Sequence, residues 1–326
     1  MTAPMFRDRT NVTATIVLGA GLGYLGFRFA RWAFVSASWA VIGERFRFIL
    51  FVSYPFGEQW RPAVVCLLFV SLYAASAVRA WWKAWLLGLC VAIVASSLVL
   101  LRGGLFGLVD VPSELWGGLP LTFVLSTVGF VAAFPLAVAL ALGRRSRMPV
   151  IRALSVTYIE LVRGVPLITF LFMAAVMFPL FAPPGLAGDK LTRAIVAFVL
   201  VIAAYLAEVI RAGLQSIPDG QQEAAASLGL SFWPATILIA LPQALRITIP
   251  ALVSTFIAFF KDTSLVAIIG LFDLLGAARA VIVDPKWVGF GVEVYLFVGA
   301  IYFAFCYGVS RYSQHLETVL AAHRRR

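Results

Sequence analysis

Long apolar runs, separated by short polar stretches, are the main feature of this sequence. Most runs approach or exceed the roughly 20 residues that a helix needs to cross about 30 Å of hydrocarbon. The run at 165–181 is shorter and has to extend into its flanks. The pattern predicts eight transmembrane helices, at residues 12–27, 62–78, 84–101, 119–142, 165–181, 191–214, 247–271 and 292–312.

The composition agrees with a membrane-embedded, all-α chain. Hydrophobic residues make up 62% of the 326 residues and charged residues 13%, whereas soluble domains have about 45–50% and 25%. Basic residues number 26 against 15 acidic ones, a net charge of +11. In a soluble protein this excess would indicate nucleic acid, but in a membrane protein basic residues at span ends set orientation. We expect a lipid bilayer and no nucleic acid as surroundings.

The reactive residue types are too scattered to form a catalytic or metal site. Cys66, Cys90 and Cys306 lie in apolar runs without paired spacing, so they indicate neither a disulfide framework nor metal ligands. His315 and His323 lie in the polar C-terminal segment. A membrane-embedded enzyme would need clustered His, Asp or Cys chemistry, and the sequence offers none.

The charges of the loops and the number of spans between them predict the orientation of the chain in the membrane. The densest basic cluster, GRRSRMPVIR at 143–152, lies in a short loop and is expected in the cytoplasm. Counting spans from it places both termini, residues 79–83 and the stretch 217–242 on the same side. The first apolar run resembles a signal peptide, but apolar residues continue past Arg28 and Arg31, which favours an uncleaved span. Residues 43–61 and 102–118 are interpreted as loops.

The polar stretch 217–242 predicts two short helices joined by a turn outside the lipid. Pro218-Asp219-Gly220 is typical of a turn, and Asp219 is a suitable cap for a helix that starts near Gln221. Gly229 is expected to end this helix in a left-handed conformation, and Ser231 to cap a second helix. Ala224 to Ala226 leave one surface without bulk beside a single acid, Glu223. Such a surface suits docking by another protein; an inert alanine-rich hairpin is the alternative.

Charged residues within membrane spans are costly and are candidates for function. Glu160 and Arg163 are three residues apart, as are Glu208 and Arg211, so each pair lies on one helix face. The predicted topology puts both pairs at one depth. They can therefore exchange partners, Glu160 with Arg211 and Glu208 with Arg163, and either close an inner gate or fix helix packing.

Lys261 and Asp262 fall about fourteen residues into the seventh predicted span. In a continuous helix with a rise of about 1.5 Å per residue, Lys261 would be about 21 Å from the inner end. Either the helix breaks there or the charge faces a cavity, and broken helices that line cavities occur in transporters. Lys261 suits a substrate carboxylate; pairing of Lys261 and Asp262 with neighbouring spans, or contact with the outer interface, is the other interpretation.

The stretch 217–242 resembles the cytoplasmic EAA loop of permease subunits of bacterial ATP-binding-cassette (ABC) importers. The residues that match this motif are Glu223, Ala224, Ala225, Gly229, Ile239, Leu241 and Pro242. YIELVRGVPL, AYLAEVIRAGLQSIPDGQ and KDTSLVAIIG resemble the polar amino-acid (His/Gln/Glu) branch. Residues 116–317 resemble the M-type permease of general L-amino-acid uptake systems for Glu, Gln, Asp and Asn.

The resemblance implies a five-helix ABC type I importer permease core at 116–317. Residues 1–115 would then add about three N-terminal transmembrane helices, and 318–326 a basic cytoplasmic tail.

The same resemblance implies an energy source outside the chain. No G-x-x-x-x-G-K-[ST] loop is present, so ATP and Mg would be bound by partner ATPase subunits, whose grooves receive the EAA helices. A second permease subunit, a related Q-type chain, and a soluble periplasmic amino-acid-binding protein complete the expected assembly in the bacterial inner membrane. An ion-coupled secondary transporter or channel is the alternative, and it predicts mid-membrane carboxylates and no ATPase dock.

Overall fold

The computed structural model describes residues 9–78, 81–82, 84–183 and 188–324. Arg79 and Lys83, the basic residues of the segment 79–83, lie outside the described residues. The α-helices are α1 (Arg9–Arg31), α2 (Ala40–Phe51), α3 (Trp60–Ala77), α4 (Ala84–Arg102), α5 (Gly118–Arg144), α6 (Pro149–Gly164), α7 (Leu167–Phe172), α8 (Phe178–Phe181), α9 (Lys190–Gln215), α10 (Asp219–Ser227), α11 (Phe232–Pro234), α12 (Leu241–Asp262), α13 (Leu274–Ile282) and α14 (Gly291–Arg324).

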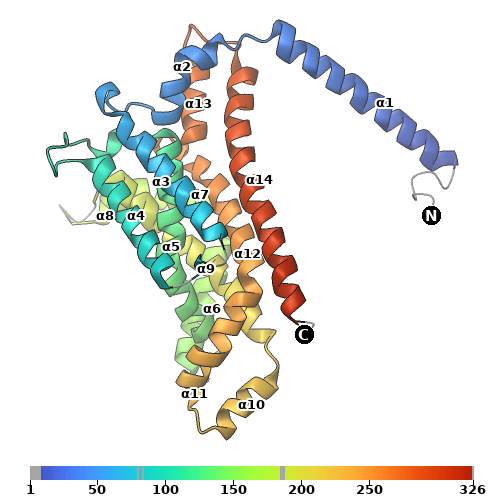
Figure 1. Ribbon diagram of the computed structural model, residues 1–326. Coiled ribbons are helices and arrows are strands. Elements are labelled where there is room, and N and C mark those ends of the chain that lie inside the picture. The colour runs from blue at the N-terminus through green and yellow to red at the C-terminus, as the bar shows by residue number, and fades with distance from the viewer. Residues whose placement is uncertain (1–8, 79–80, 83, 184–187, 325–326) are drawn as a thin grey trace.

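The helices form an elongated body with two distinct ends (Figure 1). Helices α10 and α11 project at one end, called here the loop end, while α2 and α13 lie at the opposite end, called the far end. Seven helical segments within the described residues are long and apolar enough to cross a membrane, or eight if one bent pair forms a single span. The predicted all-α, polytopic fold class is therefore confirmed.

Helices α5 and α9 form the centre of the body. Both are strongly apolar, and α9 is the most buried of the candidate spans. Small residues allow the close approach: Gly129 of α5 lies against Phe198 and Ile202 of α9. Asp189 begins α9 by accepting a hydrogen bond from the backbone N–H of Thr192 at 3.1 Å. This rigid pair holds the other elements in place.

Two of the predicted spans differ in shape from the expectation. The segment expected as one span at 165–181 is the second half of a broken unit, in which α6 meets Leu167–Phe181 at 98°. Pro166 precedes α7 and lacks the N–H that would continue α6. The span expected at 247–271 begins earlier, because α12 starts at Leu241, and its α-helix ends at Asp262.

The interpretation of residues 43–61 as a loop is wrong for its first part, which is the helix α2. Its charged residues suggested a loop, but they form ion pairs with the connection between α13 and α14: Glu44 with Lys286, and Arg45 with Asp284. Val41 and Ile49 are buried beneath them. Distant partners therefore stabilise a helix whose local sequence looks polar.

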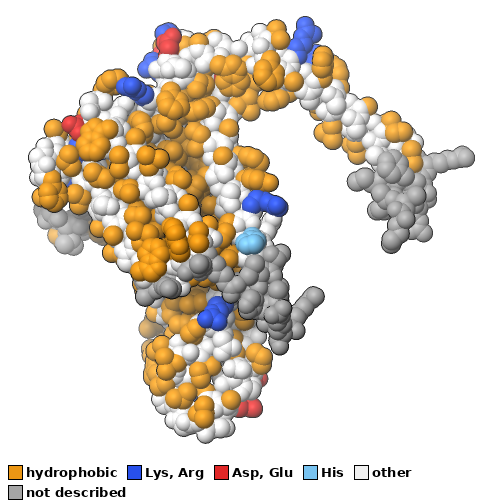
Figure 2. Space-filling view, in the orientation of Figure 1, with side chains coloured by type: hydrophobic (Ala, Val, Ile, Leu, Met, Phe, Trp, Pro, Cys, Tyr) orange, Lys and Arg blue, Asp and Glu red, His pale blue; other side chains and the backbone are white. Residues whose placement is uncertain are grey.

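The first span extends beyond the predicted 12–27, since α1 is followed by a π-helical turn at Trp32–Ser36. Helix α1 points away from the body (Figure 1), and none of its most apolar window is buried. Hydrophobic side chains also cover most of the visible side of the body, where charged ones are few (Figure 2). Such a surface is suited to lipid or to other membrane helices.

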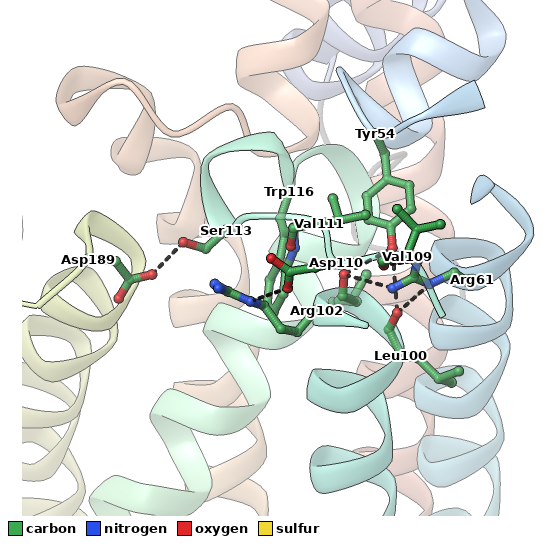
Figure 3. A network of polar contacts seen from close by, with 11 residues as sticks. Tyr54, Arg61, Leu100, Arg102, Val109, Asp110, Val111, Ser113, Trp116 and Asp189 are labelled. Carbon is green, nitrogen blue, oxygen red and sulfur yellow. Dashed lines mark hydrogen bonds and ion pairs between the residues drawn. The ribbon is translucent and has the colours of Figure 1, made fainter. Parts of the chain in front are cut away.

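A buried arginine connects two helices and a loop at the far end. Arg61 of α3 is fully buried and donates hydrogen bonds to three backbone carbonyls: from Nε to Leu100 at 2.6 Å, and from its terminal nitrogens to Val109 at 2.9 Å and Leu101 at 3.4 Å (Figure 3). Leu100 and Leu101 belong to the last turn of α4, whose carbonyls lack helical partners. Arg61 therefore joins α3, α4 and the following loop.

Neighbouring side chains extend this network towards α9 (Figure 3). Burial raises the pKa of Tyr54 to about 12, so its hydroxyl stays protonated and donates to the carbonyl of Leu101 at 3.0 Å. Ser113 donates to Asp189 at 2.5 Å. Burial alone would raise the pKa of Asp189, but hydrogen bonds from Ser113 and Thr192 outweigh it and hold that pKa below its ordinary value. The N-terminal helices are thus linked to the central pair.

Replacing Arg61 by methionine is expected to lower the free energy of unfolding by about 3 kcal/mol, because buried carbonyls lose their donor. Arg102→Met is the matched control: its ion pair with Asp110 is more than half exposed, and such pairs contribute about 1 kcal/mol or less. Thermal unfolding of the purified variants in detergent measures both. Equal losses for the two variants would contradict the structural role of Arg61.

Candidate coupling loop and substrate path

The EAA loop, residues 217–242, protrudes at the loop end (Figure 1). Helix α10 covers Asp219–Ser227, and Pro218 rather than Asp219 occupies the N-cap position. Asp219 instead lies in the first turn, where its charge complements the helix dipole. Gly229 has a φ of +75°, so the predicted left-handed residue after the helix is confirmed. The backbone N–H of Leu230 closes the turn on the carbonyl of Ala225 at 3.1 Å.

The second half of the loop is not a separate short helix as expected. Ser231 is at the N-cap position of α11, but its side chain makes no capping bond. From α11 the chain continues through a π-helical segment, Ala235–Ala240, directly into α12. The motif residues Ile239, Leu241 and Pro242 therefore belong to the lower end of a membrane-spanning helix. From α11 onwards, a displacement of the loop can be transmitted to α12 along a continuous helical segment.

The motif residues differ in exposure. Glu223 and Ala224 are exposed, whereas Ala225 is buried against the rest of the loop. Apolar side chains surround the exposed part, and five of them are more than half exposed to solvent: Leu228, Phe232, Trp233, Ile237 and Leu238. An exposed apolar patch of this kind is typical of a surface that contacts another protein or a membrane.

A cluster of ion pairs lies near the loop end, with Glu208 of α9 at its centre. One Glu208 oxygen is 2.8 Å from Arg144 of α5, and the other is 2.9 Å from Arg211 and 3.8 Å from Arg163. Arg144 also binds Glu160 of α6 at 2.8 Å. The Glu208 side chain is only 15% exposed. Helices α5, α6 and α9 are thus joined through one carboxylate.

Half of the predicted partner exchange is present. Glu208 pairs with Arg163 as expected, but the predicted pairing of Glu160 with Arg211 is wrong. Arg211 binds Glu208 on its own helix and Gln215, and Glu160 binds Arg144 instead. In the sequence, Arg144 belongs to the basic segment 143–152, which sufficed to explain its charge as an orientation signal. Its position as the last residue of α5 was the available signal.

Lys261 and Asp262 lie where the seventh span changes its helical form. The α-helix α12 ends at Asp262 and is followed by a 3-10 helix, Thr263–Ile269, and by Gly270 with a φ of +76°. The α-helical form therefore stops beside Lys261, although the chain stays helical to Ile269, and the Lys261 side chain is exposed. Among the described residues, Lys261 forms no ion pair.

A small pocket lies on the same face of α12 as Lys261. It measures about 370 Å³ and lies between α12 and α14, lined by Ser254, Ile257, Phe303, Cys306, Tyr307 and Ser310. Ser254, Ile257 and Lys261 follow at intervals of three and four residues, so they share one helix face. A larger groove of about 1180 Å³, between α3, α4, α5, α12 and α14, is almost wholly apolar. The lining of the smaller pocket contains three hydroxyl groups, from Ser254, Tyr307 and Ser310.

These features define a class of membrane permease with a protruding loop. A family model described as "binding-protein-dependent transport system inner membrane component" matches residues 129–318. The match covers more than half of the chain, and the chain belongs to this family.

Two relatives resemble the chain over most of its length. YhdY of Escherichia coli K12, an inner membrane amino-acid ABC transporter permease, is 47% identical over 294 residues, which are 86% of this chain and 77% of that protein. BztC of Rhodobacter capsulatus, a permease of a glutamate/glutamine/aspartate/asparagine transport system, is 38% identical over 346 residues, covering 87% and 79%. Both similarities cover more of the chain than the family model does.

Two solved structures resemble the fold. A crystal structure of an amino acid ABC transporter with histidines has a TM-score of 0.52 and 29% identity, covering 64% of this chain and 91% of that one. The MetNI methionine ABC transporter in an inward-facing crystal form has a TM-score of 0.50 and 20% identity, covering 61% and 91%. The latter similarity concerns the fold alone.

Proposed function

We propose that this chain is the permease subunit of an ATP-driven amino-acid importer and that the EAA loop couples it to a separate ATPase. The observation that carries the proposal is the loop itself. It exposes Glu223 and Ala224 beside an apolar patch and is continuous with α12. The relatives YhdY and BztC, which carry amino-acid transport in their names, support the substrate class.

The proposed assembly contains more than this chain. It consists of ABC ATPase subunits that bind ATP and Mg, a second permease of the Q type, and a soluble periplasmic amino-acid-binding protein. The loop end faces the cytoplasm in this proposal, together with both termini, because the basic segment 143–152 lies at that end. Closure of the ATPase pair would move α10, and α12 would carry the movement towards Lys261.

The experiment is uptake of radiolabelled glutamate and glutamine by proteoliposomes that contain the permease pair and the ATPase. The expected result is uptake that requires internal ATP and external binding protein and that continues after ionophores remove ion gradients. Uptake driven by an ion gradient without ATP would instead establish the ion-coupled alternative.

Lys261→Ala is expected to raise the half-saturating concentration for acidic amino acids on the order of tenfold, since a hydrogen bond to a charged group contributes about 1.5–3 kcal/mol. Lys261→Arg keeps the charge and should retain most of the uptake. The measurement is ATP-driven uptake at saturating binding protein. Kinetics of Lys261→Ala that equal those of the unmodified chain would remove Lys261 from the substrate path.

A further inference from the structure

Helix α6 has three distinct faces. Its buried residues, Ser155, Ile159 and Val162, pack against α5 and α9. At about 100° per residue, a second face carries Val150, Leu154, Thr157 and Leu161, all exposed. These four positions follow the spacing i, i+4, i+7, i+11, and Val150 and Leu154 are each 68% exposed. The third face carries Arg152, Glu160 and Arg163. An exposed apolar stripe thus runs along α6 beside a charged one.

The position of α6 places this stripe at the membrane surface. Arg144 ends the span α5 and binds Glu160, so α6 lies at the level where the spans end. The 98° bend after Gly164 turns α6 across the direction of the apolar segment Leu167–Phe181. A helix so oriented, with one apolar and one basic face, is typical of helices that lie in the bilayer interface.

Three arginines in the turn before α6 and in its first turn have no acidic partner among the described residues. Among the described residues, Arg145, Arg147 and Arg152 are exposed and form no ion pair, in contrast to Arg144. Met148 and Ile151, between them in sequence, are also exposed and apolar. Positive charges without partners, next to an exposed apolar face, are complementary to lipid phosphates above acyl chains.

We propose that α6 and the preceding turn form a binding surface for anionic phospholipid. Arg145, Arg147 and Arg152 contact the headgroups, and Val150, Leu154 and Leu161 enter the boundary of the acyl chains. Glu160 and Arg163 remain in the ion-pair cluster with Arg144 and Glu208. The surface would hold α6 at the membrane while α10 and α12 move.

The first experiment titrates fluorescent phosphatidylglycerol into mixed micelles of phosphatidylcholine and detergent that contain the purified full chain. Each arginine near a membrane surface contributes about fivefold in affinity. The triple variant Arg145→Gln, Arg147→Gln, Arg152→Gln is therefore expected to bind phosphatidylglycerol about a hundredfold more weakly, and the matched triple lysine variant to bind within about fivefold of the unmodified chain. Equal affinities for the glutamine and unmodified chains would overturn the proposal.

The second experiment locates the apolar stripe in the assembled transporter. In a chain whose Cys66, Cys90 and Cys306 are replaced by alanine, a nitroxide is attached at Leu154→Cys or, as a control, at Ala153→Cys on the adjacent exposed side. The label at 154 is expected to be more accessible to oxygen than to a water-soluble nickel complex, and the label at 153 to show the reverse. A label at 154 that the nickel complex reaches, or that both reagents fail to reach because protein covers it, overturns the proposal.

Discussion

Glu208→Gln is expected to abolish ATP-driven uptake and to lower the free energy of unfolding by about 3 kcal/mol. The glutamine keeps the size of the side chain but removes the only carboxylate that contacts Arg144, Arg163 and Arg211 together among the described residues. Three positive charges would then share a largely buried site, and α5, α6 and α9 would lose their common partner. Thermal unfolding and uptake in proteoliposomes measure the two effects.

Glu160→Gln provides the matched control, since Glu160 belongs to the same cluster but is 58% exposed and has one basic partner, Arg144. Loss of such a pair changes stability by about 1 kcal/mol or less. Comparable losses for Glu160→Gln and Glu208→Gln would mean that Glu208 is not the centre of the cluster. A stable Glu208→Gln chain that still loses uptake would favour the gate over helix packing.

The spans were predictable because each is determined by its own composition. The fourth and sixth predicted spans, 119–142 and 191–214, nearly coincide with α5 and α9. Long apolar runs have one stable conformation in a bilayer, since a helix satisfies its backbone hydrogen bonds internally. The left-handed conformation of Gly229 was predictable for a similar reason, because the position after a helix often adopts this conformation and glycine adopts it most easily.

The features that the sequence did not reveal depend on distant partners. Arg61 resembles an ordinary loop residue in the sequence, and its burial follows from the carbonyls of Leu100 and Val109, which are 39 and 48 residues later. Helix α2 likewise packs Val41 and Ile49 against residues of α13 and α14, which are far away in the sequence. Neither the spacing of residues in the sequence nor its composition indicates these contacts.

Helix α6 was not predicted as a separate helix, for another reason. Its 16 residues are too few for a span, and its apolar positions are divided between a buried and an exposed face. The sequence places Glu160 and Arg163 at the start of a straight span, whereas they lie in the last part of α6, before the bend. The bend after Gly164 changes the partner that Glu160 reaches, which is why Arg144 replaces Arg211.

Gly229→Val is expected to reduce co-purification of the permease with its ATPase at least tenfold, while thermal unfolding of the permease alone stays unchanged. A Cβ at Gly229 would meet no atom within 4 Å, so the effect arises from the backbone. At a φ of +75° a β-branched residue is strained, and the turn that orients the nine-residue α10 would shift. Gly220→Val is the matched control, because Gly220 is equally open but has no positive φ.

Glu223→Lys tests the same surface without disturbing the backbone. Glu223 is exposed, and the hydrogen bond of Ser227 to its carbonyl involves only the main chain of Glu223. Charge reversal should therefore leave the fold intact and weaken ATPase binding as strongly as Gly229→Val, whereas Asp219→Asn, at the start of α10, should have little effect. If Gly229→Val and Glu223→Lys both retain ATPase and uptake, the EAA loop is an inert hairpin and the energy for transport enters elsewhere.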